Sequence, residues 1–195
     1  MCLYMRVIRH HNSIATRMDL LVGIPRGSLI DIETTGLDPV RHEIITVGSI
    51  SGSRLCVIQR KSRRKEPFYD EIKKVLSRLP RPFYAYNSGF EESFLEAQLG
   101  VRFKMKDLMK PWREMASNRT IKWPKLDELV SEPEMYYNVT RITAKDIPTL
   151  WHAYLTNQDQ KLLEMPLRHN RADLLRELYL LVQYEHLYEL AKEIK

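Results

Sequence analysis

Two acidic residues lie inside an otherwise apolar, strand-like segment and constrain the fold more than any other feature. Residues 29–39 read LIDIETTGLDP, so Asp31 and Glu33 alternate with isoleucines just ahead of a turn that contains glycine and proline. Residues i and i+2 of a strand point to the same face, so both carboxylates are aimed at one spot. Like charges in a core are costly unless a cation neutralises them. Either this strand end faces water or caps the turn, or the pair binds a hard cation such as Mg²⁺ or Mn²⁺.

The segments around this strand predict a mixed α/β fold, because strands and helices alternate along the first half of the chain. The expected strands cover residues 27–33, 42–51, 53–60 and 82–87. The first three follow one another through short turns and should form an antiparallel meander. Helical spacing of apolar residues predicts helices over residues 66–79 and 90–99, ended by Pro80 and Gly100 respectively.

The second half of the chain is expected to be helical. The predicted helices cover residues 123–130, 146–155 and 166–195, and the last one has a leucine-rich apolar stripe. No internal repeat or low-complexity linker divides the chain. We therefore expect one domain over residues 18–195, with residues 1–17 as a peripheral N-terminal extension.

Composition excludes several classes of protein. A chain of 195 residues that is 44% hydrophobic and 29% charged is typical of a folded domain with a proper core. No stretch approaches the roughly 20 apolar residues that span a bilayer. The basic residues near the N-terminus follow a short apolar patch rather than precede it, so we expect no signal peptide. Two separate cysteines support neither a disulfide framework nor a cysteine metal site, so a cytoplasmic, reducing location is expected.

The net charge of +6 is consistent with a polyanionic partner such as nucleic acid, although charge alone does not decide the matter. Residues 60–65, RKSRRK, form a basic cluster between a predicted strand and a predicted helix. This cluster is either a loop that contacts a phosphate backbone or a solvated hairpin tip. Trp112, Trp123 and Trp151 are expected in the helical core. Trp123 is also a candidate for base stacking, because lysines flank it.

Further acids occur at the ends of other predicted elements. Glu91 and Glu92 lie in the first turn of the helix that follows the fourth strand, where acids also complement the helix dipole. Asp173 lies on the leucine-rich helix, and His169 precedes it by four residues on the same face. One acidic pair holds a metal ion poorly, so these residues are the candidate partners of the first pair.

Three segments in this order resemble the motifs of the DEDD superfamily of 3′–5′ exonucleases, which have a ribonuclease H-like fold. DIETTGLDP resembles the first motif, AYNSGFEESFL the second, and HNRADLL the third. The resemblance runs from Leu29 to Leu180 and is greatest to the predicted exonucleases related to the editing domain of family B polymerases. It implies a mixed sheet, an antiparallel three-strand meander plus parallel strands, that is flanked by helices.

Two positions depart from the family pattern. Glu91 stands where the family usually has aspartate, and its longer side chain should still reach a metal ion. His169 precedes Asp173 with three intervening residues, which is the spacing of the tyrosine-type members, whereas histidine-type members have four.

The resemblance also implies the roles of individual residues. The implied ligands of two Mg²⁺ or Mn²⁺ ions are Asp31, which bridges both ions, Glu33, Glu91 and Asp173. His169 would act as general base or position the attacking water, because an imidazole exchanges protons near neutral pH; alternatively it is a helix-start residue that faces water. The residues implied to contact substrate are Thr34, Thr35 and Leu37 at the terminal nucleotide, and Asn87, which either fixes its turn or touches the substrate.

Three functions are consistent with these motifs. The first is a metal-dependent 3′–5′ exonuclease that hydrolyses phosphodiester bonds at the ends of single-stranded DNA or RNA. The second is a non-catalytic nucleic-acid-binding domain of the same fold, favoured by the two departures from the family pattern. The third is a structure-specific endonuclease, since a ribonuclease H-like core with acidic residues also serves that reaction.

Overall fold

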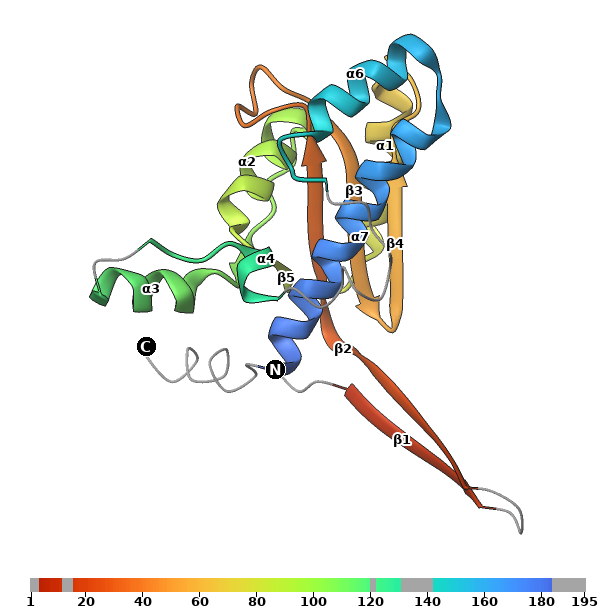
Figure 1. Ribbon diagram of the computed structural model, residues 1–195, viewed down its shortest axis with the longest axis vertical. Helices are drawn as coiled ribbons and strands as arrows, with labels where there is room; N and C mark the ends of the chain where they lie inside the picture. Colours follow the sequence, from red (N-terminus) through yellow and green to blue (C-terminus); the bar gives the residue numbers. More distant parts are fainter. Residues whose placement is uncertain (1–3, 12–15, 120–121, 131–141, 184–195) are drawn as a thin grey trace.

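The computed structural model describes residues 4–11, 16–119, 122–130 and 142–183. A five-stranded sheet with the order β4-β3-β2-β5-β6 lies at its centre (Figure 1). These strands are β2 (Thr16–Thr34), β3 (Ile44–Gly52), β4 (Arg54–Gln59), β5 (Phe83–Ala85) and β6 (Met105–Asp107). The pairs β2/β3 and β3/β4 are antiparallel, whereas β2/β5 and β5/β6 are parallel. The mixed sheet expected from the sequence, a meander plus parallel strands, is confirmed.

Helices flank this sheet. They are α1 (Glu66–Arg78), α2 (Ser88–Leu99), α3 (Lys110–Arg119), α4 (Leu126–Leu129), α6 (Ile147–Asn157) and α7 (Gln160–Gln183). Helix α1 shows why these segments are helical: a proline stands in its first turn, and Phe68, Ile72 and Leu76 recur at a spacing of four on its buried face. The predicted helices at 66–79, 90–99 and 146–155 agree with α1, α2 and α6.

The two faces of β2 pack against different helices. Ile30 and Ile32 belong to an apolar cluster with the buried side chains of α1 and α2. Leu29 belongs to a second cluster, to which α7 contributes its leucines. Because alternate residues of a strand face opposite sides, Asp31 and Glu33 lie on the α7 face of the sheet. Helix α7 crosses this face in Figure 1.

A glycine in β3 lets α7 approach the sheet closely. Gly48 pairs directly with Asp31 of β2. A Cβ atom at Gly48 would lie 2.0 Å from Asn170 Oδ1 and 2.6 Å from Leu174 Cδ1, both on α7, so no larger residue fits without a shift. The side chain of Asn170 is fully buried as a result. The helix is therefore seated against the strand that carries the first acidic pair.

Helix α7 begins at Gln160, six residues before the expected start, and Pro166 lies inside it. Proline usually ends a helix because it lacks an N–H group, which is why residue 166 was expected to be the start. The turn before it is retained because Leu163 is buried in an apolar cluster with α6. His169 is therefore an internal helix residue. The part of the predicted 166–195 helix that follows Gln183 lies outside the described residues.

The tryptophans differ in their environments. Trp151 is 2% exposed in the cluster between α6 and α7, so its assignment to the core is confirmed. Trp123 is 47% exposed, so the expectation of a core position was wrong. The physical reason is that α4 spans only Leu126–Leu129, shorter than the predicted helix 123–130, and leaves Trp123 in the preceding loop. Trp112 lies partly buried on α3, a helix that the sequence did not predict.

Strand β1 (Tyr4–His11) pairs antiparallel with the first part of β2, from Tyr4 opposite Gly23 to His11 opposite Thr16. Figure 1 shows this two-stranded ribbon extending away from the helices. Strand β2 begins at Thr16, so it runs through the boundary expected between residues 17 and 18, and the division into an extension and one domain stays a prediction. Within the described part of the chain, none of the helices is both long and apolar enough to cross a membrane.

Candidate functional site

Five carboxylates from three elements gather at the end of β2. Asp31 and Glu33 come from β2, Glu91 comes from the first turn of α2, and Asp173 and Glu177 lie one turn apart on α7. The side chains of Glu33, Glu91 and Glu177 are buried, with Glu177 only 1% exposed. Buried acids on this scale are rare unless they are paired or coordinate metal ions.

The electrostatics show that these acids share one environment. Burial raises the pKa of Asp31, and the Asp173 charge raises it further. Burial also raises the pKa of Glu33, with added repulsion from Asp31, Asp173 and Glu91. The pKa of Glu91 is raised by burial and then by Asp31. The four acids expected as ligands therefore lie within electrostatic reach of one another.

Three of the carboxylates have an oxygen that no described protein group satisfies. Glu33 Oε1, Glu91 Oε2 and Glu177 Oε2 are buried and have no hydrogen-bond partner among the described residues. A buried polar atom without a partner costs about 1–3 kcal/mol, and more when the group is charged. Divalent cations such as Mg²⁺ and Mn²⁺ take oxygen ligands of this kind, so the residues present fit such ions.

His169 lies beside this cluster. Its Nε2 atom is 3.4 Å from Asp173 Oδ2, and the two side chains are 13% and 21% exposed. Glu33, His169 and Asp173 each offer a ligand atom, and these atoms all lie within 4.8 Å of one another. The alternative interpretation of His169 as a helix-start residue that faces water was wrong, because α7 begins nine residues earlier, at Gln160.

Two neighbours orient the aspartates. The Asn170 amide donates to Asp31 Oδ2 at 2.7 Å and to the Asp31 carbonyl at 3.2 Å. The Arg176 guanidinium is 2% exposed, donates to Asp173 Oδ1, and donates through Nε to the Val130 carbonyl at 3.0 Å. Hydrogen bonds of this kind, with an ionised partner, are stronger than neutral ones and hold the carboxylates in place.

The turn before α2 positions Glu91. Asn87 adopts a left-handed conformation with φ of 67° at the start of the helix. Its backbone N–H donates to Asp107 Oδ1 at 3.1 Å, and its side-chain oxygen accepts from Arg113. Arg113 also pairs with Asp107 at 3.0 Å. Both the backbone and the side chain of Asn87 thus hold the turn in place.

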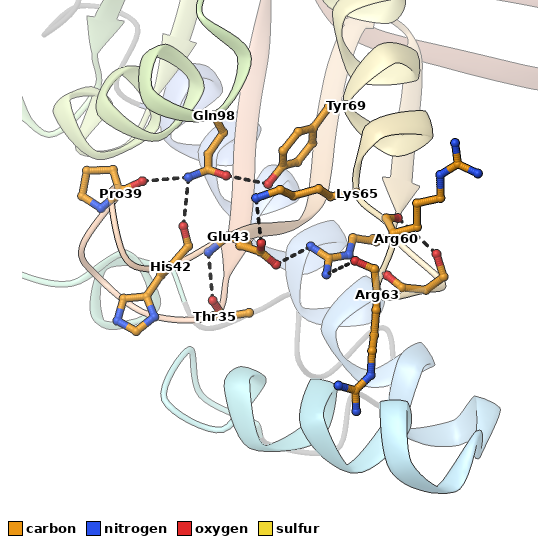
Figure 2. Close-up of polar contacts among 11 residues, drawn as sticks. Thr35, Pro39, His42, Glu43, Arg60, Arg63, Lys65, Tyr69 and Gln98 are labelled. Atoms are coloured by element: carbon orange, nitrogen blue, oxygen red, sulfur yellow. Dashed lines mark hydrogen bonds and ion pairs between the residues drawn. The ribbon is translucent and has the colours of Figure 1, made fainter.

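The turn that follows β2 is held by hydrogen bonds (Figure 2). Thr35 Oγ1 accepts from the Glu43 N–H at 2.9 Å, and the Thr35 N–H donates to the Glu43 carbonyl at 2.9 Å. Gln98 of α2 donates to the carbonyls of Pro39 and His42 at 2.8 and 3.1 Å.

Apolar side chains at the tip of the same turn are exposed. The Thr34 hydroxyl donates to the Gly36 carbonyl at 2.6 Å, which tightens the turn just after the acidic pair. Leu37 and Val40 are 83% and 85% exposed. The two threonines thus support the backbone of the turn, and Leu37 is exposed at its tip.

Two residues of the basic cluster at residues 60–65 pair with Glu43, and its other basic residues are exposed (Figure 2). Arg60 is 4% exposed, pairs with Glu43 at 2.8 Å, and stacks over the Trp151 ring at 5.0 Å. Lys65 pairs with the same carboxylate at 2.9 Å. Burial raises the pKa of Glu43, but the hydrogen bonds and charges of its two basic partners outweigh burial and lower that pKa overall. The intervening residues Lys61, Arg63 and Arg64 are exposed.

Sequence reasoning missed Glu177 and Asn170. The signal for Glu177 was present, because it follows Asp173 by four residues on the same helix face within a leucine-rich run. Asn170 had no such signal, since its partner Asp31 lies 139 residues away.

Comparisons with known proteins give one family match and several similar solved structures. The family model of the RNase H superfamily matches residues 29–185. Curated proteins give no match. Among solved structures, a nuclease in its apo form is 20% identical, with a TM-score of 0.41 over 82% of this chain and 86% of that chain. Brucella melitensis NrnC with bound Mg²⁺ is 18% identical, with a TM-score of 0.40 over 82% and 87%. The same protein bound to pGG is 17% identical, with a TM-score of 0.40 over 88% of each chain.

The matched residues run from the start of the acidic segment of β2 to the end of α7, and so include all five clustered carboxylates. The mixed sheet and its flanking helices are those expected of a ribonuclease H-like fold. The chain therefore belongs to the RNase H superfamily.

Proposed function

We propose that this protein is a metal-dependent 3′–5′ exonuclease that hydrolyses phosphodiester bonds at the ends of single-stranded DNA or RNA in the cytoplasm. One observation carries the proposal: buried carboxylate oxygens without protein partners among the described residues converge at the end of β2 in a member of the RNase H superfamily. Such a cluster is expensive to bury for structural reasons alone, which favours a role in holding cations.

Asp31, Glu33, Glu91 and Asp173 would hold two Mg²⁺ or Mn²⁺ ions. When bound, these ions would supply an activated water and stabilise the leaving 3′ oxygen. His169 would accept the proton of the attacking water; its imidazole lies beside Asp173 and is only 13% exposed, which supports this role. Arg176 keeps Asp173 oriented.

Exposed groups around the cluster would contact the strand. Leu37 at the tip of the turn after β2 would pack on the terminal base, with Thr34 and Thr35 setting the shape of that turn. Trp123 would stack on a base further along the strand, since it is 47% exposed and Arg113 lies 5.9 Å from its ring centroid. Asn87 would act through the turn that carries Glu91 rather than by direct contact.

A degradation assay tests the proposal. Single-stranded DNA and RNA labelled at the 5′ end are incubated with Mg²⁺ or Mn²⁺, and the products are compared with those of Asp31→Asn and of Asp70→Asn, which changes an exposed acid on α1. We expect ladders that shorten from the 3′ end, loss of activity in Asp31→Asn, and full activity in Asp70→Asn.

Circular single strands separate the competing functions. An enzyme that requires an end leaves circles intact, so cleavage of circles would contradict the proposal and indicate an endonuclease. Salt-sensitive binding of strands without any cleavage in either metal would instead indicate a non-catalytic binding domain.

A further inference from the structure

We propose that Glu177 is a fifth carboxylate of the cation centre, where it holds one of the two cations together with Asp31 and Glu91. The inference rests on the proposed function in that it assumes a two-cation centre at the end of β2. It assigns a metal-binding role to a residue outside the four acids that the sequence motifs supply.

A backbone hydrogen bond fixes the position of Glu177. The N–H of Tyr86 donates to Glu177 Oε1 at 2.7 Å. Strand β5 runs parallel to β2, with Phe83 opposite Ser28 and Tyr84 opposite Leu29. Tyr86 follows Ala85, the last residue of β5, and precedes α2. The carboxylate of Glu177 is therefore held at the end of β5, at the junction that leads into α2.

Glu177 and Glu33 are influenced by the same three acids, Asp31, Asp173 and Glu91. Burial raises the pKa of Glu177, and the negative charges that raise it further are those of Asp31, then Glu91, then Asp173. For Glu33 the order is Asp31, then Asp173, then Glu91. Both glutamates therefore belong to the carboxylate cluster that contains Asp31.

The contacts in the structure divide the carboxylates into two sets of candidate ligands. One set consists of Glu33 and Asp173, whose ligand atoms lie within 4.8 Å of each other and of a His169 nitrogen. The other set consists of Glu91 and Glu177, which lie outside that group and, like Glu33, each have a buried oxygen without a protein partner among the described residues.

A structural role alone does not account for an acid at this position. Hydrogen bonding to the Tyr86 N–H occupies one oxygen, and a neutral amide would accept that bond equally well. The second oxygen is buried without a partner in the part of the chain that the structure describes, in a side chain that is 1% exposed. Cation binding would satisfy this oxygen.

The charges agree with the same conclusion. Five ionised carboxylates carry five negative charges, which two divalent cations and the buried Arg176 guanidinium together neutralise. With only the four expected acids, the same two cations and Arg176 would leave one positive charge in excess. A low-dielectric site favours the neutral arrangement.

Metal binding without substrate tests the inference. Mn²⁺ binding is measured by calorimetry, and by electron paramagnetic resonance of the free ion, for wild type, Glu177→Gln and Glu164→Gln. Glu164 is an exposed acid on the same helix and serves as the matched control. We expect two Mn²⁺ ions in wild type and in Glu164→Gln. In Glu177→Gln we expect one ion to bind as before and the other to bind at least about tenfold more weakly, a loss of about 1.4 kcal/mol.

The glutamine variant keeps the acceptor for the Tyr86 N–H and should fold, which circular dichroism of the metal-free protein checks. If it does not fold, Glu177→Asp, which retains the charge but withdraws the carboxylate by one methylene group, must show the same selective loss. Two ions bound with wild-type affinities in the folded variant would overturn the inference, as would fewer than two ions in wild type.

These outcomes are separate from the test of activity. A protein that binds two ions in a Glu177-dependent manner but does not degrade strands would contradict the proposed function and leave the inference standing. A protein that degrades strands and binds both ions without Glu177 would contradict the inference alone.

Discussion

The contact between α7 and β3 at Gly48 should decide whether the cation centre forms. In Gly48→Ala the new Cβ atom would lie 2.0 Å from Asn170 Oδ1 and 2.6 Å from Leu174 Cδ1. Both distances are well inside van der Waals contact, so either these side chains or the whole helix must move away from the strand. Any such movement carries Asn170 away from Asp31, which Gly48 faces across the sheet.

The expected loss follows from two effects. Overpacking a well-packed site costs about 1–3 kcal/mol of unfolding free energy. Loss of the 2.7 Å hydrogen bond from Asn170 to the Asp31 carboxyl group adds about 0.5–3 kcal/mol, the range from a neutral to a charged partner. For a chain of this size, each kcal/mol corresponds to about 2–4 °C in melting temperature. We also expect weaker Mn²⁺ binding, because α7 carries Asp173 and Glu177.

Gly89→Ala is the matched control, since the chemical change is the same. A Cβ atom at Gly89, in the first turn of α2, meets nothing within 4 Å. We expect this variant to be unchanged or stabilised by at most about 1 kcal/mol. Unfolding in denaturant and Mn²⁺ calorimetry are measured for both variants. If Gly48→Ala retained the unfolding free energy and metal affinity of wild type, the reasoning that α7 is seated through this glycine would be refuted.

Three further predictions concern pH, the turn after β2 and Trp123. Because burial raises the pKa of four clustered acids, the folded metal-free protein binds more protons than the unfolded chain above the ordinary carboxyl range. Its stability should therefore fall as pH rises above about 4, and the stabilisation by Mn²⁺, measured as the difference in melting temperature with and without the ion, should grow. Gln98→Ala removes the donor to the carbonyls of Pro39 and His42, so steady-state kinetics should show a raised KM for single strands with a smaller change in kcat. Trp123→Ala should weaken binding of long strands in fluorescence titrations by about 1–3 kcal/mol, the value of one stacked base, and leave dinucleotide hydrolysis unchanged.

Each of these predictions has an outcome that contradicts it. The range from about pH 5 to pH 8 lies above the ordinary carboxyl pKa. If the stabilisation by Mn²⁺ shrank as pH rose through this range, the clustered acids would not be losing protons in it. Glu96→Ala, an exposed change on the same helix, is the control for Gln98→Ala. If the two variants had the same kcat and the same KM, the turn would have no role in substrate binding. For Trp123, equal effects on short and long strands would exclude stacking at a distance from the cleaved bond.

Local patterns in the sequence determined most of the elements around the site and the identity of most of its acids. Apolar residues on both faces of residues 29–33 indicated a buried strand. Asp31 and Glu33 are two residues apart, which placed both carboxylates on one face of that strand. The spacing of four between His169 and Asp173 placed them on one side of a helix. These inferences succeeded because strand and helix periodicity is a property of short segments that neighbours along the chain already specify.

Local patterns failed where burial depends on distant segments. Arg60 was read only as part of a basic cluster, yet it is buried because Glu43 and Trp151 surround it. Trp123 was expected in the core and is exposed because α4 is short. In both cases the charge or hydrophobicity of a residue was known, but its partners were not.

The tertiary structure alone decided which side chains complete the site. Helix α7 lies close enough for Asn170 to bond Asp31 across 139 residues because Gly48 leaves no Cβ atom between them. That close approach also carries Glu177 to the Tyr86 N–H and the end of β2. The periodicity of side chains predicts which face of a helix a residue occupies. How deeply that face is buried depends on the packing of elements that are far apart in the chain.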